Sequence, residues 1–429
     1  MTQPLLQPEI LEVVFSNLDG KSLLKSSRVC STWKNVVEYM TGVTKVWKQC
    51  CEEEIHQDVL TDISTNLYPT LLSSSQEDNT KWRNIYLCWV QWKNIDRWPS
   101  IKKEVFTISR RNEFITCMKM SGNCIITGHL YGGIHIWDCS QGYLGFVTMH
   151  LKEVTDLGLL YIPGLKFSTE RELDVKHNLV ISTSLDHTIR VTALCLNAEQ
   201  VIVLRHHVGP TTSLGVYRSM FVVTGEDDCL SIWKIVAQPK ASHVECPVLV
   251  YSRLDIDSPV QVVSLWRGKV TGITASNHFY CLKRLHGENI NADITGLQKF
   301  EEKNCHIVRK YIWRHWICAW LTGHRQMYIA VGQNHASRKY NTMPALLSYP
   351  TALLLYGEMF LLGMESGIIY LYLINTPEDL LKLDLDCYKW KQPVSSEPIL
   401  FMDIAEDNAE PMIVVTAGQK LYYISLQPS

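Results

Sequence analysis

The sequence lacks the features that mark nucleic-acid-binding and exported proteins. Its 41 lysines and arginines are balanced by 43 acidic residues, so there is no excess of positive charge for a nucleic acid or an anionic membrane surface. The N-terminus shows neither a basic region nor a small-residue cleavage site, so no secretory signal peptide is expected. We therefore expect a cytoplasmic or nuclear protein, with neither nucleic acid nor membrane among its partners.

Metal-binding and redox motifs are also missing. The 14 cysteines include no C-x-x-C pair, which argues against a zinc or thioredoxin-type site. Without an export signal, reduced thiols are the simplest state for these cysteines. His206 and His207 are adjacent, but no third and fourth ligand follow at a useful spacing. We expect no metal site and no cofactor.

Catalytic motifs and long apolar runs are absent as well. The chain has no G-x-S-x-G, P-loop or H-E-x-x-H motif, so we predict no catalytic residues and a non-enzymatic role. The most apolar window, residues 349–374, is interrupted by Glu358, Glu365 and several glycines. That pattern indicates buried strands separated by turns.

The length and the apolar patterns of the chain predict two domains with different secondary structure. With 429 residues, 46% apolar and 20% charged, the chain can form more than one packed core. Apolar residues recur at helical spacing near the N-terminus, at Ile10, Leu11, Val14, Phe15 and Leu18. Asp19-Gly20 ends this first helix, and Ser31 or Thr32 is expected to cap a third. The boundaries that we predict are 1–58 for an all-α domain, 59–99 for a helical linker and 100–429 for a β-domain.

The linker is expected to contain a polar loop and an aromatic helix. Residues 61–80 are rich in serine and threonine and predict a loop. Over residues 81–98, Trp82, Tyr86, Trp89 and Lys93 fall at helical spacing. This aromatic face either binds a partner or, as we favour, packs the first domain onto the second.

After residue 100, short β-branched runs alternate with tight turns and resemble one another. The clearest copies are IITGHLYGGIHIWD (125–138), VISTSLDHTIRVTA (180–193), VVTGEDDCLSIWKI (222–235) and FLLGMESGIIYLYL (360–373). A period between about forty and the mid-fifties, with two to four strands in each copy, is typical of a β-propeller. Seven copies fit the length, and a strand from the start of the propeller is expected to close the last blade.

These copies resemble WD repeats, with departures. Residues 183–191, TSLDHTIRV, match well and place Asp186 at the structural aspartate of the family. Tyr131 and Ser366 stand where other copies would have that aspartate, and the copy at 224–233 is one residue short. The resemblance implies a mainly β, seven-bladed WD-like propeller in which several blades lack the aspartate-centred hydrogen-bond network.

The N-terminal segment resembles an F-box over residues 5–47. The residues that match the family pattern are Leu6, Glu9, Ile10, Leu11, Phe15, Leu18, Asp19, Leu23, Leu24, Val29, Cys30, Trp33 and Trp47, whereas Gln7 replaces the usual proline. An F-box followed by WD-like repeats is the layout of F-box/WD-repeat proteins. That resemblance implies an SCF ubiquitin-ligase subunit that binds a Skp-type adaptor, and through it a cullin scaffold.

The resemblance also implies an adaptor-binding set. Pro8, Ile10, Leu11, Leu18, Leu23, Leu24 and Val29 would divide between the adaptor interface and the core of the F-box itself, and Cys30 and Trp33 would lie on either side. A segment of this size cannot bury so many apolar side chains alone.

The target-binding site is less evident from the sequence. Some family members bind phosphorylated targets through several arginines around the channel, but only Arg190 is a permanent cation at the equivalent position of the good repeats. Arg190 is the one candidate, and a surface pair is the simpler interpretation. Two rivals to a target-recognition subunit remain: a non-ligase propeller scaffold with a degenerate F-box, and a propeller enzyme, which would need convergent, perturbed acids at the channel.

Overall fold

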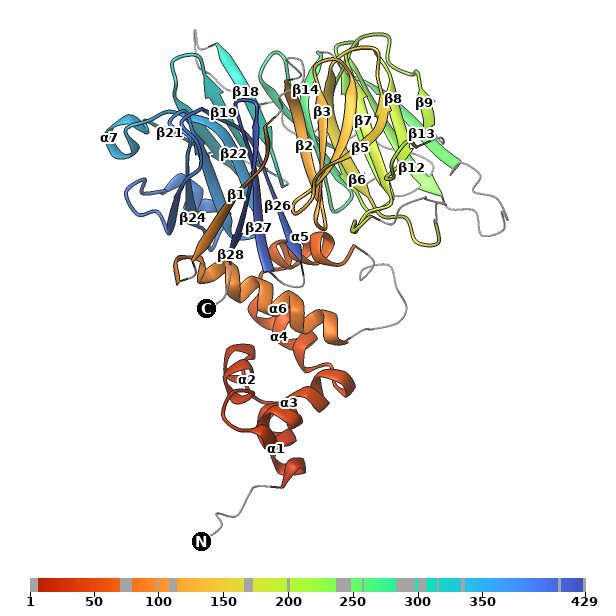
Figure 1. Cartoon of the computed structure of the whole chain (residues 1–429). Coiled ribbons are helices and arrows are strands. Elements are labelled where there is room, and N and C mark those ends of the chain that lie inside the picture. The colour runs from red at the N-terminus through yellow and green to blue at the C-terminus, as the bar shows by residue number, and fades with distance from the viewer. Residues whose placement is uncertain are drawn as a thin grey trace.

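The structure is a computed structural model of the chain. It describes residues 7–69, 79–97, 99–107, 114–165, 173–198, 201–236, 248–256, 258–282, 298–299, 306–314, 316–332, 336–407 and 410–426. Within these ranges, a helical N-terminal part stands below a large β-domain (Figure 1).

Three short helices form the N-terminal unit: α1 (Pro8–Phe15), α2 (Gly20–Ser26) and α3 (Ser31–Val43). Pro8 starts α1, where its missing N–H costs no helical hydrogen bond. Asp19 caps α2 by accepting a hydrogen bond from the Ser22 N–H at 2.6 Å. The predicted cap of α3 was wrong by a residue, because Cys30 is the N-cap and Ser31 already lies within the helix.

The linker contains three further helices: α4 (Val46–Glu54), α5 (Gln57–Leu67) and α6 (Asn79–Lys93), and α6 is followed by the short 3-10 helix η1 (Ile95–Arg97). The predicted loop was wrong over residues 61–67, which continue α5 because Val59, Ile63 and Leu67 recur at helical spacing and are buried. The rest of that loop prediction falls mostly outside the described residues. The predicted aromatic helix is present as α6, but Trp98 lies outside the described residues. The domain boundary at residue 58 stays a prediction, and α5 spans it.

The β-domain consists of seven four-stranded antiparallel sheets, which we number as blades 1–7. Blades 1–3 contain β2 (Ile115–Ser121), β3 (Cys124–His129), β4 (Gly133–Asp138), β5 (Gly142–Met149); β6 (Val154–Leu160), β7 (Leu179–Ser184), β8 (Ile189–Ala193), β9 (Val201–Leu204); and β10 (Thr211–Tyr217), β11 (Met220–Gly225), β12 (Cys229–Val236), β13 (Val248–Asp255).

Blades 4–6 follow the same order of strands. They contain β14 (Val260–Trp266), β15 (Lys269–Thr274), β16 (His278–Leu282), β17 (Gln298–Lys299); β18 (Ile307–Ile312), β19 (Ile317–Thr322), β20 (Met327–Val331), β21 (Ala336–Tyr340); and β22 (Pro350–Tyr356), β23 (Met359–Met364), β24 (Ile368–Leu373), β25 (Trp390–Pro393). Helix α7 (Met343–Leu346) precedes blade 6, and the 3-10 helix η2 (Pro377–Leu381) lies within it.

Blade 7 joins the two ends of the β-domain. It contains β26 (Ile399–Asp407), β27 (Glu410–Ala417), β28 (Lys420–Leu426) and, as its outer strand, β1 (Ser100–Thr107), which pairs antiparallel with β28. The predicted closure by a strand from the start of the propeller is therefore observed. The predicted fold class is confirmed: a mainly β, seven-bladed propeller preceded by helices.

The first strand of each blade has the same irregularity. In β2, β6, β10, β14, β18, β22 and β26 the pairing register shifts after the first residue, which places an extra residue in the second position. Four of these second positions are threonines, and each donates to the backbone carbonyl at the first position of the next inner strand. These bonds are Thr116 to Val154 (2.5 Å), Thr155 to Thr211 (2.9 Å), Thr212 to Val260 (2.9 Å) and Thr351 to Ile399 (2.6 Å). We call this set the threonine belt. It ties neighbouring blades together around the channel.

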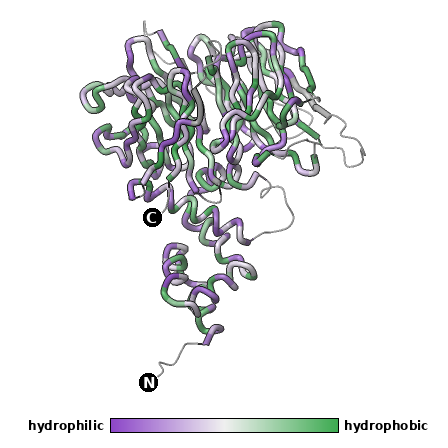
Figure 2. The backbone as a smooth tube through the Cα atoms, in the orientation of Figure 1, coloured by the Kyte–Doolittle hydropathy of each residue, from purple (hydrophilic) through white to green (hydrophobic). Residues whose placement is uncertain are grey.

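The helices share a hydrophobic core with part of the propeller. Buried residues of α1–α6 form one continuous cluster with residues of blades 6 and 7, including Ile369 and Ile413. Both the strands of the propeller and the N-terminal helices carry hydrophobic as well as hydrophilic residues (Figure 2). The linker helices α5 and α6 thus pack onto the propeller, and the N-terminal unit packs onto the linker helices.

Candidate binding surfaces

Helix α1 divides its apolar residues between two faces. Leu11 and Phe15 are 2% and 1% exposed and lie in the core of the N-terminal unit. Ile10, Val13 and Val14 are 47%, 66% and 47% exposed, at the i, i+3 and i+4 spacing that places them on one side of the helix. This exposed stripe has no covering partner within the described chain, so it is a candidate interface.

The residues predicted to bind an adaptor are distributed as follows. Leu23 is fully buried in the same cluster as Leu11, whereas Leu18, Leu24 and Trp33 are half-buried and pack against that cluster. The ring of Trp33 contacts that of Phe15 edge-on, with centroids 5.2 Å apart.

The other predicted residues are exposed. Pro8, Val29 and Cys30 are open to solvent, Val29 at 62%. The exposure of Val13 and Val14 was not predicted, although the helical spacing of Ile10, Val13 and Val14 was the signal that would have identified them.

A carboxylate fastens the N-terminal unit to the linker. Glu54 of α4 accepts one hydrogen bond from the Gly20 N–H at 2.7 Å and another from the Tyr86 hydroxyl at 2.5 Å. A side chain at position 20 would collide with the Tyr86 ring, since a Cβ there would lie 2.4 Å from it. Glycine at the start of α2 therefore permits the close approach of α6.

Helix α5 covers one end of the propeller channel (Figure 1). Its Asp62 carboxylate accepts from the Gly357 N–H at 2.9 Å and from the Arg314 side chain at 3.0 Å, and both charged side chains are nearly buried. Asp58 on the same helix pairs with Arg267 at 3.3 Å. These contacts lie at the far ends of the inner strands of blades 4, 5 and 6.

A second buried acidic residue, Glu406, joins the linker helices α5 and α6 to blade 7. It accepts from Tyr356 at 2.5 Å, from Asn66 of α5 at 2.8 Å and from the Trp92 indole of α6 at 3.2 Å. Burial raises the pKa of Glu406 to about 7, although the hydrogen bonds from Tyr356 and Trp92 act in the opposite direction. On α6, Lys93 pairs with Glu358 at 3.0 Å, which adds a contact to blade 6. The helices and the propeller are held as one body by these contacts.

The channel is a cavity of about 1050 Å³ lined by the inner strands of all seven blades, with Asp62 among its lining residues. Several charged side chains lie along it. Burial raises the pKa of Asp156 and of Asp403, and Lys119 opposes both shifts. Perturbed acids at a channel are the feature that a propeller enzyme would need.

The contacts of these two acids explain their burial structurally. Asp403 of blade 7 accepts from the Met120 N–H of blade 1 at 2.8 Å. Asp156 of blade 2 accepts from the Leu214 N–H of blade 3 at 3.0 Å and from its own neighbour Leu157 at 2.9 Å. Each carboxylate satisfies a backbone donor of the next blade, as expected of fasteners between blades.

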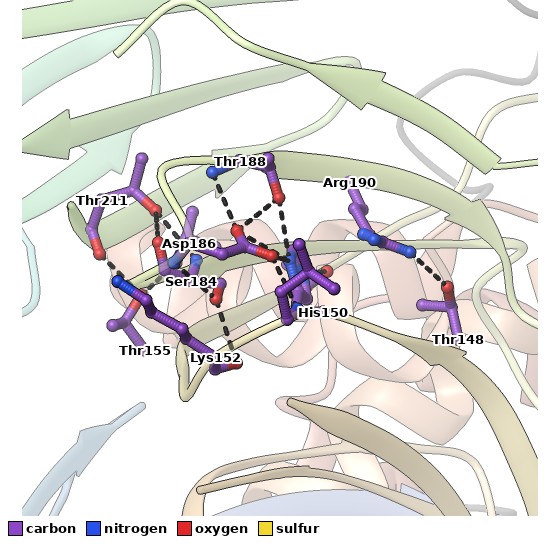
Figure 3. A network of polar contacts seen from close by, with 12 residues as sticks. Thr148, His150, Lys152, Thr155, Ser184, Asp186, Thr188, Arg190 and Thr211 are labelled. Atoms are coloured by element: carbon purple, nitrogen blue, oxygen red, sulfur yellow. Dashed lines mark hydrogen bonds and ion pairs between the residues drawn. The ribbon is translucent and has the colours of Figure 1, made fainter. Parts of the chain in front are cut away.

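Blade 2 contains the aspartate-centred network that the sequence predicted at Asp186 (Figure 3). His150 contacts Asp186 through Nδ1 at 3.2 Å and Ser182 through Nε2 at 2.8 Å. Asp186 also accepts from the Leu151 N–H at 2.8 Å and from the Thr188 hydroxyl at 2.5 Å. Burial would raise the pKa of Asp186, but the hydrogen bonds from His150 and Thr188 lower it overall.

Blade 3 repeats this network, which was not predicted from the sequence. His207 contacts Asp227 at 2.9 Å and Ser231 at 2.8 Å, and Asp227 accepts from the Val208 N–H at 2.8 Å. The position of the histidine could have identified this network, because His150 and His207 each precede the first residue of the inner strand by four positions. Asp227 was not recognised because the repeat that contains it is one residue short.

One group of metal-ligand residues lies in the described part of the chain. The ligand atoms of His207, Asp227 and Cys229 lie within 4.8 Å of one another. Both ring nitrogens of His207 are already engaged, by Asp227 and by Ser231. We therefore explain the group as part of the internal network of blade 3.

Arg190, the candidate for target binding, lies half-buried in β8, away from the residues that line the channel. Its guanidinium donates to the Thr148 hydroxyl at 3.2 Å (Figure 3). Burial lowers its pKa, and the nearby positive charge of Arg205 lowers it further. A role of Arg190 in target binding stays a prediction.

Across the described residues, every helix is too short or too polar to span a bilayer.

Comparisons with known proteins agree with this architecture. Residues 4–41 match the family described as F-box domain. A search of curated protein sequences gave no significant match. Among solved structures, the crystal structure of the WD40 beta propeller domain of Doa1 superposes with a TM-score of 0.52 at 11% identity, covering 77% of this chain and 98% of that one.

That structural likeness concerns the fold alone. An F-box domain at residues 4–41 and a seven-bladed, WD40-like propeller are together consistent with an F-box/WD-repeat protein. Domains of both kinds typically act as adaptors or recognition modules rather than as catalysts, and F-box domains generally bind Skp-type adaptors.

Proposed function

We propose that the protein is the target-recognition subunit of an SCF ubiquitin ligase. Its F-box binds a Skp-type adaptor, the adaptor links it to a cullin scaffold, and the propeller binds the protein to be modified. The observation that carries the proposal is the F-box match together with the exposed apolar stripe on α1. Such a subunit works in the cytoplasm, the nucleus or both.

The adaptor interface is centred on the stripe of Ile10, Val13 and Val14 and continues to Val29. Burying four such side chains supplies roughly 6–12 kcal/mol before the cost of association, which is enough for a stable complex. Leu11 and Leu23 act from beneath, because they hold the helices that carry the exposed residues.

In this proposal the subunit positions the target protein and does not itself catalyse a reaction. In such a complex, ubiquitin arrives on a separate carrier, and holding the target near it raises the effective concentration of the target lysine. A fixed geometry between adaptor and target supports this role, and the contacts of Glu54, Asp62 and Glu406 provide it here. The channel acids Asp156 and Asp403 serve as fasteners, which favours a non-catalytic subunit over a propeller enzyme.

The test is co-purification of the full chain with the Skp-type adaptor and a cullin. Val13→Asp with Val29→Asp places two charges on exposed positions and leaves Leu11 and Leu23 in place, so the fold is retained. We expect the double variant to lose the adaptor, by about a hundredfold or more in affinity, because each charge would be desolvated in an apolar interface.

The matched control carries the same kind of change at the other end of the molecule, Leu151→Asp with Val208→Asp, and should bind the adaptor normally. Recovery of neither partner, or of the adaptor without the cullin, would contradict the ligase proposal and favour the scaffold alternative.

A further inference from the structure

Blade 3 brings together three side chains of the types that bind zinc. The ligand atoms of His207, Asp227 and Cys229 lie within 4.8 Å of one another, and the Cys229 side chain is fully buried. In the protein without a metal, His207 and Asp227 are joined by a hydrogen bond and belong to the internal network of the blade. Cys229 is the member that distinguishes this network from that of blade 2.

The equivalent residue of blade 2 is a threonine. Thr188 and Cys229 each follow the network aspartate of their blade by two positions, and in both blades the intervening residue has a positive φ. The Thr188 hydroxyl donates to Asp186 at 2.5 Å and lies 3.0 Å from Nδ1 of His150. A side chain at this position therefore lies beside both the carboxylate and the ring nitrogen. In blade 3 a thiol replaces the hydroxyl, which adds a soft ligand to the pair.

The other polar atoms of the histidine and the aspartate already have partners that orient them. Nε2 of His207 lies 2.8 Å from the Ser231 hydroxyl, which donates to the Val223 carbonyl at 3.3 Å. One oxygen of Asp227 accepts from the Val208 N–H at 2.8 Å, while the other faces Nδ1 of His207 at 2.9 Å. Outer partners of this kind orient the ligands of metal sites in proteins.

The distances and the charges both suit zinc. A tetrahedral zinc ion with nitrogen, oxygen and sulfur ligands holds the ligand atoms about 3.3–3.6 Å apart, so shifts of roughly one ångström form the site. The thiolate of Cys229 and the carboxylate of Asp227 together neutralise the two charges of the ion, which suits a buried position. The Asp227 side chain is 8% exposed and that of His207 is fully buried, so the aspartate forms the edge of the group that faces solvent.

We infer that blade 3 binds a zinc ion through Nδ1 of His207, one carboxylate oxygen of Asp227 and Sγ of Cys229, with water as the fourth ligand. The ion replaces the proton that links His207 to Asp227. The imidazole stays neutral because Nε2 then carries the ring proton and donates it to Ser231, and the Cys229 thiol releases its proton to solvent. This inference goes beyond the proposed function and does not depend on it.

Binding of the ion should stabilise the start of blade 3. Asp227 also holds the Val208 N–H, so a metal on its other oxygen fixes the loop that precedes β10. A ligand that binds only the folded protein raises its stability. Zinc should therefore raise the melting temperature of the chain.

The test titrates the full chain, reduced and free of metal, with cobalt(II) and then with zinc. Cobalt held by a thiolate shows a sulfur-to-metal absorption band that nitrogen and oxygen ligands alone do not produce. We expect one cobalt ion for each chain, with this band, and its loss when one equivalent of zinc is added.

Two variants separate the ligand from the residue that orients it. Cys229→Thr gives blade 3 the residue of blade 2, so the fold should be retained, but one of three protein ligands is lost. We expect no thiolate band, zinc affinity lowered about a hundredfold or more, and no rise in melting temperature with zinc. Ser231→Ala leaves all three ligands and should keep the band while weakening zinc binding about tenfold.

The control removes the two exposed cysteines of the described chain, Cys30→Ser with Cys387→Ser, and should bind cobalt as the unmodified chain does. Circular dichroism checks that each variant is folded. Absence of a thiolate band in the unmodified chain, a band that persists in folded Cys229→Thr, or a band that disappears in the control would overturn the inference. Should Cys229→Thr fail to fold, Ser231→Ala decides, because zinc affinity equal to that of the unmodified chain would contradict ligation by His207.

Discussion

The two ends of the molecule both expose apolar side chains, but they are built in opposite ways. On α1, exposed Ile10, Val13 and Val14 share one helix with buried Leu11 and Phe15, so surface and core are made by neighbouring residues. At the opposite end of the propeller, the exposed residues Leu151, Val208 and Leu347, which we call the apolar rim, come from three blades, and each lies in the loop three residues before an inner strand. The first surface depends on one helix, whereas the second depends on the closure of the whole propeller.

Because they are built from separate parts of the chain, the two surfaces can be altered independently. The buried contacts of α4, α5 and α6 separate them, and no rim residue belongs to the hydrophobic cluster that supports α1. A substitution at one end should therefore leave the other end intact.

The largest effect is expected from comparing a buried with an exposed leucine. Leu11→Ala removes a side chain that is 2% exposed and should lower the free energy of unfolding of the N-terminal helices by about 3 kcal/mol. Leu151→Ala at the rim should change stability by less than about 0.5 kcal/mol. Denaturant unfolding monitored by circular dichroism measures both changes in stability. Similar losses of stability in the two variants would contradict the assignment of Leu11 to the core and of Leu151 to the surface.

The next largest effect on stability is expected at Glu406, which joins helices α5 and α6 to blade 7. Glu406 keeps its proton in the folded state up to about pH 7, whereas in the unfolded chain it releases it near its ordinary value of 4.5. Its contribution to stability is thus complete below pH 4.5 and is lost as pH rises through 7. Between pH 5 and pH 7 we expect the unmodified chain to lose about 2 kcal/mol more than Glu406→Gln.

Chemical denaturation at several pH values gives this slope for each variant. Glu397→Gln is the matched control, because Glu397 is an exposed glutamate of the same face as the rim. A slope that is unchanged in Glu406→Gln would show that this carboxylate does not titrate in the junction.

The smallest effect on stability is expected in the threonine belt, which joins neighbouring blades where their inner strands start. Thr116→Val keeps the shape of the side chain but removes the hydrogen bond to the Val154 carbonyl, which should cost about 1 kcal/mol of propeller stability. Adaptor affinity should not change. Val308→Thr introduces a hydroxyl at the equivalent position of blade 5, where the belt is interrupted, and should not destabilise the propeller; a loss there equal to that of Thr116→Val would contradict the role of the belt.

The sequence predicted what is local. The helices of the N-terminal unit, the aromatic helix α6 and the propeller fold class followed from apolar spacing and from the repeated turn-strand copies. Asp186 was recognisable because its whole turn matched. The sequence did not show that Leu11 of the predicted adaptor-binding set is buried while Ile10 is exposed. The helical pattern indicates that the helix has two faces, but it does not indicate which face the rest of the chain covers.

What the sequence could not predict is set by contacts between distant residues. Asp227 was overlooked because it lies in a shortened turn and two strands, β10 and β11, separate it from its histidine partner. Glu406 gave no signal, since its burial results from Asn66 and Trp92 arriving from the linker. The rim is likewise invisible until the inner strands are in register, because three isolated apolar residues in loops have no local pattern.

The pairing of β1 with β28 has a consequence for how the chain is made. Ser100 pairs with Leu426, so the ribosome synthesises the first of these partners before almost all of the propeller and the second after it. Throughout that interval β1 has no partner, while the helices before it are already complete. A nascent chain can therefore fold its F-box helices before the propeller is closed. Loss of the final strand would leave β1 and β27 with open edges, which are the kind of surface on which unfinished proteins aggregate.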